Sequence, residues 1–219
     1  MQPYFSPYAG YYRLFASVDI FVILDCVQFP RRGWVHRNQF TKKDNSLDWL
    51  TLPVKKCSQQ TLIKDLEFDS LHKLSEFHVS LAKFNLPSLM SEVEISATFD
   101  FTTPIIDFLE KSLIDSSRTL HFNPTIIRSS SFCLPSNLKG EDRVLEILKL
   151  VNANQYINLF GGLSLYDLKV FRQNKIELKI LAPFLGNKIG MIERLKVATA
   201  NEIRWEIMNA SKFLNLDEV

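Results

Sequence analysis

The chain has 219 residues, 46% of them hydrophobic and 12% aromatic, which suits one packed domain over residues 1–219 rather than a disordered chain. Lys and Arg number 26 against 24 Asp and Glu, a formal net charge of +2. This near balance excludes a broad basic surface, so we expect no nucleic-acid partner and only a local site for any anion.

The N-terminal third begins with an aromatic segment. Pro3 and Pro7 oppose regular structure, so the sequence predicts an ordered loop followed by a short helix over 11–17. The apolar run from Asp19 to Asp25 predicts a strand buried on both faces, with Asp25 at its C-terminal end, where open α/β sheets bind ligands. The longer apolar run from Val18 to Phe29 is broken by Asp19 and Asp25, and the first fifteen residues lack a signal-peptide pattern, so we expect no membrane insertion and a cytoplasmic location.

The next segments mix turns, strands and helices. Residues 29–37 predict a turn rich in basic side chains. Residues 49–54 and 62–68 contain β-forming side chains separated by a polar stretch, which predicts two strands paired as a hairpin. Apolar residues at spacings of three and four then predict helices over 71–84 and 102–120.

The second half alternates strands and helices. Gly161 and Gly162 follow one predicted strand and allow close approach of a ligand. The alternation predicts a mixed α/β fold with a single, partly parallel sheet and flanking helices. The strands are expected from 125, over 156–159 and over 176–181, and the helices over 141–151, 168–173 and 198–216.

Common catalytic and metal-binding signatures are absent from the sequence. There is no nucleophile elbow, phosphate-binding loop, dinucleotide fingerprint or zinc-protease motif. Cys26, Cys57 and Cys133 are odd in number and far apart, which favours reduced thiols. We therefore expect neither a metal site nor a cofactor.

One group of residues has the character of a ligand site. Three arginines within residues 31–37 lie beside Trp34. Guanidinium groups bind phosphate through paired hydrogen bonds and aromatic rings cover a sugar or base, so the expected small-molecule substrate is a nucleotide sugar. The candidate catalytic residue is Asp25. The candidate substrate-binding residues are Gln2, Tyr4, Tyr11, Gln28, Arg32, Trp34, Arg37, Asn38, Gly161 and Gly162.

This hypothesis requires the tyrosine-rich opening, Asp25 and the arginines to converge around one ligand. The alternative is that the arginines are solvated hairpin charges and the tyrosines a hydrophobic collar.

Ordered blocks of the sequence resemble the WbqC-like protein family. The likeness extends from Met1 to about Leu181. The blocks are Gln2-Pro3-Tyr4-Phe5, Asp19 to Phe29, Arg32-Gly33-Trp34 with Arg37-Asn38, Trp49-Leu50-Thr51, Gly140 to Arg143, Tyr156-Ile157-Asn158, Gly161-Gly162 and Leu165-Tyr166-Asp167.

The resemblance implies a role in bacterial O-antigen, lipopolysaccharide or related polysaccharide biosynthesis, through glycyl or acyl transfer to a nucleotide-linked amino sugar. In that role Asp25 would take the amine proton, and Arg32 or Arg37 would hold the diphosphate. Two alternatives remain open: nucleotide-sugar binding without turnover, and a nucleotidyltransferase-like enzyme of Rossmann type. The second rests on a loose likeness of Phe5 to Tyr11 to the first loop of nucleotidyltransferases, with tyrosines in place of two histidines.

Overall fold

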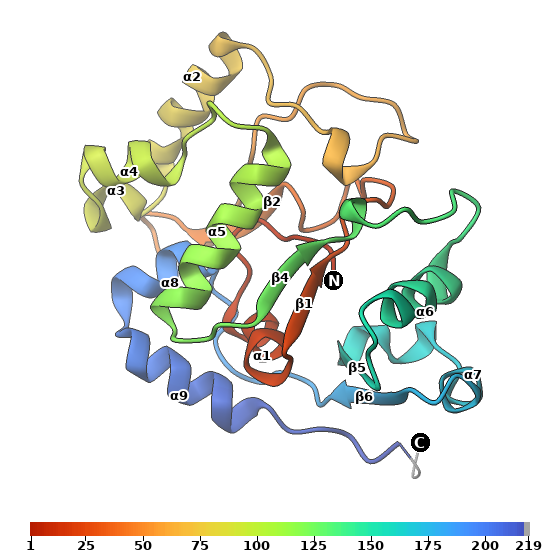
Figure 1. Cartoon of the computed structure of the whole chain (residues 1–219). Coiled ribbons are helices and arrows are strands. Elements are labelled where there is room, and N and C mark those ends of the chain that lie inside the picture. Colours follow the sequence, from red (N-terminus) through yellow and green to blue (C-terminus); the bar gives the residue numbers. More distant parts are fainter. Residues whose placement is uncertain (217–219) are drawn as a thin grey trace.

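Short strands and helices alternate along the chain in the computed structural model, which describes residues 1–216 (Figure 1). The strands are β1 (Ile20–Ile23), β2 (Arg37–Thr41), β3 (Leu47–Thr51), β4 (Thr125–Arg128), β5 (Gln155–Leu159) and β6 (Glu177–Leu181). The α-helices are α1 (Ala9–Ser17), α2 (Leu71–Ser80), α3 (Leu86–Leu89), α4 (Glu92–Thr98), α5 (Ile105–Thr119), α6 (Gly140–Leu150), α7 (Leu168–Gln173), α8 (Met191–Val197) and α9 (Ala200–Ala210). Short 3₁₀ helices are η1 (Ile63–Asp65), η2 (Leu81–Lys83), η3 (Ser129–Ser131) and η4 (Phe160–Leu165).

These strands form separate two-stranded sheets. β1 is parallel to β4, β5 is parallel to β6, and β2 and β3 form an antiparallel hairpin. The mixed α/β class with flanking helices is confirmed, but the prediction of a single sheet is wrong for the described residues. No Rossmann-type or nucleotidyltransferase fold is confirmed.

The edge of β1 that faces away from β4 shows why the β1–β4 sheet does not extend to β5. The Met1 nitrogen donates to the Val22 carbonyl and the Leu24 N–H donates to the Met1 carbonyl, both at 2.8 Å. This is the hydrogen-bond pattern of a parallel neighbour, so Met1 occupies the edge at the end of β1. β5 packs against α1 instead of pairing with β1.

The hairpin of the first third pairs strands other than those predicted. β3 pairs with β2, whereas residues 62–68 contain η1 and meet the end of the predicted partner strand through one isolated bridge. The turn between β2 and β3 explains this pairing. The Asp44 carboxylate accepts from the Ser46 N–H at 3.0 Å and hydroxyl at 2.6 Å, and Asn45 adopts a φ of 64°. Asn and Asp are suited to such a turn.

The C-terminal helix is shorter than predicted. α9 begins at a capping box formed by Thr199 and Glu202 and ends at Ala210. The chain then becomes extended, and the Leu214 N–H donates to the Ile180 carbonyl of β6 at 2.8 Å. Pairing with β6 therefore replaces the last turns of the predicted helix.

Two hydrophobic clusters organise the molecule. The main cluster contains the aromatic side chains of the N-terminal segment, with the Phe15 and Phe21 rings stacked at 4.1 Å between centroids. A smaller cluster, the second cluster, fills the space between α6, α7, β5 and β6, which gather on one side of Figure 1. Its buried members are Leu145, Leu148, Phe171, Ile176, Leu178 and Ile180.

Candidate functional site

A cleft of about 890 Å³ lies where the two clusters face each other. One wall comes from the N-terminal segment, α1 and β1, and the other from α6, β5 and η4. A cleft of this size accommodates a small-molecule ligand. The predicted binding residues that line it are Gln2, Tyr4, Trp34, Gly161 and Gly162.

Neutral hydroxyl and amide groups line the cleft among a larger number of apolar side chains. Burial raises the pKa of Tyr4 and Tyr8, and it raises that of Tyr156 well above its ordinary value, so these phenols remain protonated at neutral pH. The Tyr156 and Tyr166 hydroxyls lie 3.1 Å apart, and the Asn158 amide donates to them at 3.3 and 3.4 Å. The wall formed by β5 and η4 thus presents a connected polar network.

The two glycines have different roles. A Cβ on Gly162 would lie 2.3 Å from Nδ2 of Asn158, so only glycine leaves room for that amide. A Cβ on Gly161 would meet no heavy atom within 4 Å. Gly162 therefore supports the polar network, whereas Gly161 borders open space at the cleft.

Next to the cleft, a row of aromatic and basic side chains begins at Trp34. Trp34, which is 39% exposed, lies 5.2 Å from Trp49 between ring centroids, and the Arg37 guanidinium carbon lies 4.4 Å from the Trp49 ring centroid. Arg37 and Gln39 alternate along β2 and so share one face, and Gln39 lines the cleft. Arg37 Nη2 donates to the Arg32 carbonyl at 2.8 Å. Arg32 and Arg37 thus lie beyond Trp34, outside the cleft lining.

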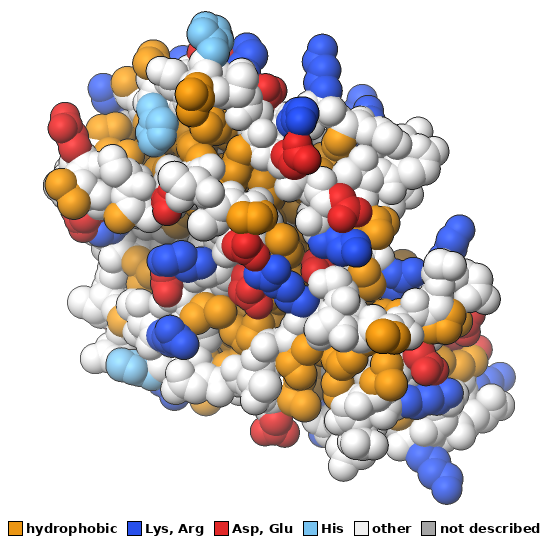
Figure 2. All heavy atoms as spheres, turned by 45° about the horizontal axis from the view of Figure 1, so that its top comes forward, with side chains coloured by type: hydrophobic (Ala, Val, Ile, Leu, Met, Phe, Trp, Pro, Cys, Tyr) orange, Lys and Arg blue, Asp and Glu red, His pale blue; other side chains and the backbone are white. Residues whose placement is uncertain are grey.

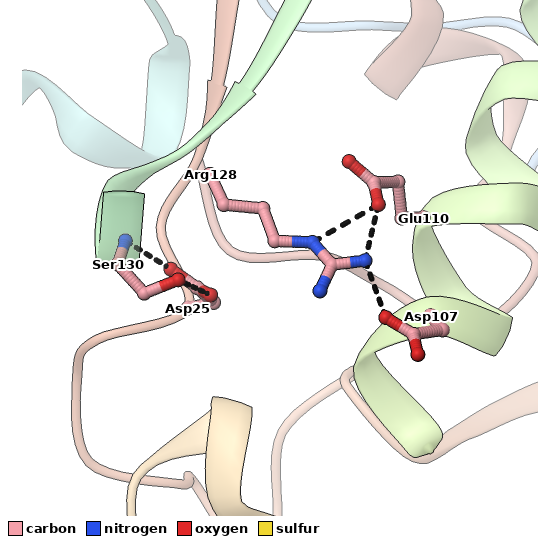
Figure 3. A network of polar contacts seen from close by, with 5 residues as sticks. All are labelled: Asp25, Asp107, Glu110, Arg128 and Ser130. Carbon is pink, nitrogen blue, oxygen red and sulfur yellow. Dashed lines mark hydrogen bonds and ion pairs between the residues drawn. The ribbon is translucent and has the colours of Figure 1, made fainter. Parts of the chain in front are cut away.

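Asp25 follows β1 as predicted, but it does not line the cleft. Its side chain is fully buried. The carboxylate accepts hydrogen bonds from the Ser130 N–H at 2.8 Å and the Ser130 hydroxyl at 2.5 Å (Figure 3). It also accepts one from the Ser129 hydroxyl at 2.8 Å. These contacts join the end of β1 to the turn after β4. The role of Asp25 as a general base stays a prediction.

Two further arginines, which sequence reasoning did not single out, lie near this edge. Arg128 at the end of β4 is paired with Glu110 and with Asp107 of α5, the latter at 2.6 Å (Figure 3). Arg143 of α6 donates to the Cys26 carbonyl, and its Nη1 lies 3.2 Å from Cys26 Sγ. Both side chains connect helices to the ends of the parallel strands.

The remaining predicted residues contact backbone. Tyr11 is buried, and its hydroxyl donates to the Gln2 carbonyl at 2.8 Å. Asn38 is also buried, and its amide donates to two carbonyls of the N-terminal loop at 3.1 and 2.5 Å. Gln28 is exposed and donates to the Gln59 carbonyl at 2.6 Å. The structure therefore does not bring these three side chains into the cleft.

Sequence reasoning missed several polar residues that line the cleft, among them Gln39, Asn158 and Lys188. The sequence signal for Asn158 is the block Tyr156-Ile157-Asn158, which is part of the family resemblance. Gln39 and Lys188 have no local motif, because their placement depends on contacts between distant segments.

Acidic and basic side chains are interspersed over the face shown in Figure 2, without a large basic patch there. Within residues 1–216, no group of three or more His, Cys, Asp and Glu side chains is placed to hold a metal ion. No helix in this part of the chain has the length and apolar character needed to cross a membrane.

The family model described as the WbqC-like protein family matches residues 2–184, which include every described residue that lines the cleft except Met1 and Lys188. The chain belongs to the WbqC-like protein family. This WbqC-like chain is similar to "Uncharacterized protein Rv1507c" of Mycobacterium tuberculosis (strain ATCC 25618 / H37Rv), with 34% identity over 89 residues. The aligned part covers 37% of this chain and 38% of that protein. No solved structure gives a significant match.

Proposed function

We propose that this WbqC-like protein binds a nucleotide-linked amino sugar in the cleft and transfers a glycyl or other acyl group to its amine, in bacterial surface polysaccharide biosynthesis. One observation carries the proposal: the cleft gathers Tyr4, Tyr8 and Trp34 opposite the polar network of β5 and η4. Aromatic rings cover the faces of a sugar or base, and amides and hydroxyls bind its polar edge.

The basic side chains at the rim support a phosphate-containing ligand. Lys188 lines the cleft, and Arg37 lies beside Trp49, which contacts Trp34. A ring held against Trp34 would direct an attached diphosphate toward Arg37 or Lys188. Guanidinium and ammonium groups both bind phosphate, guanidinium with the more defined geometry.

The proposed reaction joins the sugar nitrogen to the carbonyl carbon of an activated acyl donor. The C–N bond forms, the bond to the donor's leaving group breaks, and the amine loses a proton, which the departing leaving group or solvent water takes up. The negative charge that develops on the carbonyl oxygen requires hydrogen-bond donors. Tyr156 and Tyr166 provide hydroxyls of this kind, and burial keeps Tyr156 protonated by raising its pKa.

Binding without turnover is a second candidate function, favoured by the scarcity of acid–base groups in the cleft. Among the described residues that line the cleft, Asp19 is the only carboxylate, and there is no Cys or His. The predicted base, Asp25, is buried and accepts three hydrogen bonds elsewhere. The same cleft can therefore be tested for binding and for chemistry separately.

The binding test compares two leucine variants by isothermal titration calorimetry with a uridine-diphosphate-linked 4-amino sugar. In Gly161→Leu the new side chain enters open space beside the cleft, so folding is expected to be retained and affinity to fall at least about tenfold. Ala82→Leu is the matched control, because Ala82 is exposed and outside the cleft. Equal affinity of both variants would place the ligand elsewhere.

The chemical test incubates the protein with the same amino sugar and glycyl thioester or glycyl adenylate, followed by mass spectrometry. Formation of an amide that Gly161→Leu does not form supports the transferase. Binding with no amide in either protein supports the second candidate and contradicts acyl transfer for these donors.

A further inference from the structure

The charges in the cleft are few and of opposite sign. Of the described residues that line it, Asp19 is the only Asp or Glu and Lys188 is the only Lys or Arg. Both residues are exposed. Neither side chain forms an ion pair or a side-chain hydrogen bond within residues 1–216, so both charges are available to a ligand.

These two charges lie near opposite ends of α1. Gly190, two residues after Lys188, forms a β-bridge with Tyr8, which is the N-cap of α1. Asp19 stands two residues after Ser17, where α1 ends. A nine-residue helix is roughly 13 Å long. Because Tyr8 and Ser17 both line the cleft, the cleft follows α1 between a basic and an acidic end.

The backbone holds Asp19 firmly in this position. Its carbonyl accepts a hydrogen bond from the Thr125 N–H at 2.8 Å, which begins the β1 and β4 pairing. Ser17, at the end of α1, and Asn154, directly before β5, also line the cleft with polar side chains. The acidic end is therefore a fixed part of the fold, set by the start of a strand.

We infer that Asp19 binds the ammonium group of the ligand and that Lys188 binds its anionic group, so that the cleft selects a nucleotide-linked sugar carrying a free amine. This inference rests on the proposed function and adds its specificity-determining residue. A diphosphate joined to a hexose ring has its negative charge on one side and a ring amine on the other, which matches the order of the two side chains. A hydroxyl in place of the amine would leave Asp19 without its charged partner.

The experiment measures the affinity of two ligands, a uridine-diphosphate-linked 4-amino sugar and its 4-hydroxy counterpart, by calorimetry at pH 7. The parent protein is expected to prefer the amine by about fivefold, the size of a partly exposed ion pair. Asp19→Asn should bind both ligands equally, at the affinity of the parent for the hydroxy sugar. Lys188→Met should weaken both ligands by the same factor and retain the preference.

Two controls separate this inference from the proposed function. Asp65→Asn removes an exposed carboxylate outside the cleft and should retain the fivefold preference. Thermal unfolding of Asp19→Asn should match the parent, because the backbone hydrogen bond of residue 19 is kept. If both ligands bind and Asp19→Asn retains the preference, the inference fails alone. If neither ligand binds the parent, the proposed function fails and this inference with it.

Discussion

The side chain of His36 is packed among its neighbours, and this packing changes its pKa. Its ring meets Phe29 edge-on at 4.9 Å between centroids, and Nδ1 is buried without a hydrogen-bond partner in residues 1–216. Burial, reinforced by the neighbouring Arg37 charge, lowers the pKa of His36 to about 4. His36 is therefore neutral at physiological pH.

This pKa predicts a specific loss of stability in acid. Below pH 6.5 the unfolded chain takes up a proton at His36 and the folded chain does not, so the contribution of this residue to stability falls as the pH drops from 6.5 to about 4. The slope is at most about 1.4 kcal/mol per pH unit. Urea unfolding at several pH values should show a weaker acid dependence for His36→Asn.

The matched control for this series is His72→Asn, on exposed α2, which should keep the pH dependence of the parent. If His36→Asn and the parent lose stability in parallel between pH 6.5 and 4, the neutral, buried state assigned to His36 is wrong.

At the level of elements, α1 is held in place by a buried arginine. Arg13 is only 1% exposed, and burial lowers its pKa. Its guanidinium donates to the carbonyls of Gly10 at 3.2 Å, Ala182 at 2.8 Å and Ala210 at 3.0 Å. Ala182 follows β6 and Ala210 ends α9, so one side chain connects α1 to two distant elements.

Removing this connection should destabilise the protein. Arg13→Met keeps an unbranched side chain but removes the Arg13 donor from the Ala182 carbonyl and one of two donors from the Ala210 carbonyl, which also accepts from the Lys212 N–H. The expected cost is about 2–4 kcal/mol in the free energy of unfolding. Urea titration measures the change. Arg118→Met, at an exposed site in α5, should change stability by less than about 0.5 kcal/mol. Equal costs for the two variants would contradict the role given to Arg13.

In the molecule as a whole, polar contacts as well as packing hold the second cluster against the main one. Arg143 of α6 donates to the Cys26 carbonyl, on the main cluster's side of the cleft. The extended C-terminal segment provides another connection, from Leu214 to Ile180. Because the cleft lies between the clusters, these contacts set the positions of its two walls.

We therefore expect Arg143→Met to loosen the second cluster selectively. Amide hydrogen exchange followed by mass spectrometry should become faster over residues 140–181 than over α5, because the local opening free energy of this region falls. Lys149→Met, at the exposed end of α6, is the control. A uniform change along the chain would contradict the proposed role of Arg143.

Local pattern was sufficient for much of the secondary structure and for the family. The spacing of apolar residues predicted α2, α5 and α6, and the run between two carboxylates predicted β1 with Asp25 at its end. Of the residues expected to share one ligand site, Gln2, Tyr4, Trp34, Gly161 and Gly162 line one cleft, whereas Asp25 and the arginines do not; ligand binding there stays a prediction. These features depend on residues near one another in sequence or on residue types that suit ligands.

Tertiary structure alone decided which strands pair and which candidate side chains are accessible. Asp25 is buried because Ser129 and Ser130, more than one hundred residues later, bind its carboxylate. The sheet stops at β1 because Met1 occupies its edge. Asp19 and Lys188 are far apart in sequence, but both line one cleft because their segments lie near the two ends of α1. Hydrophobic periodicity specifies which face of an element is buried, but not which distant backbone will satisfy its hydrogen bonds or cover its charges.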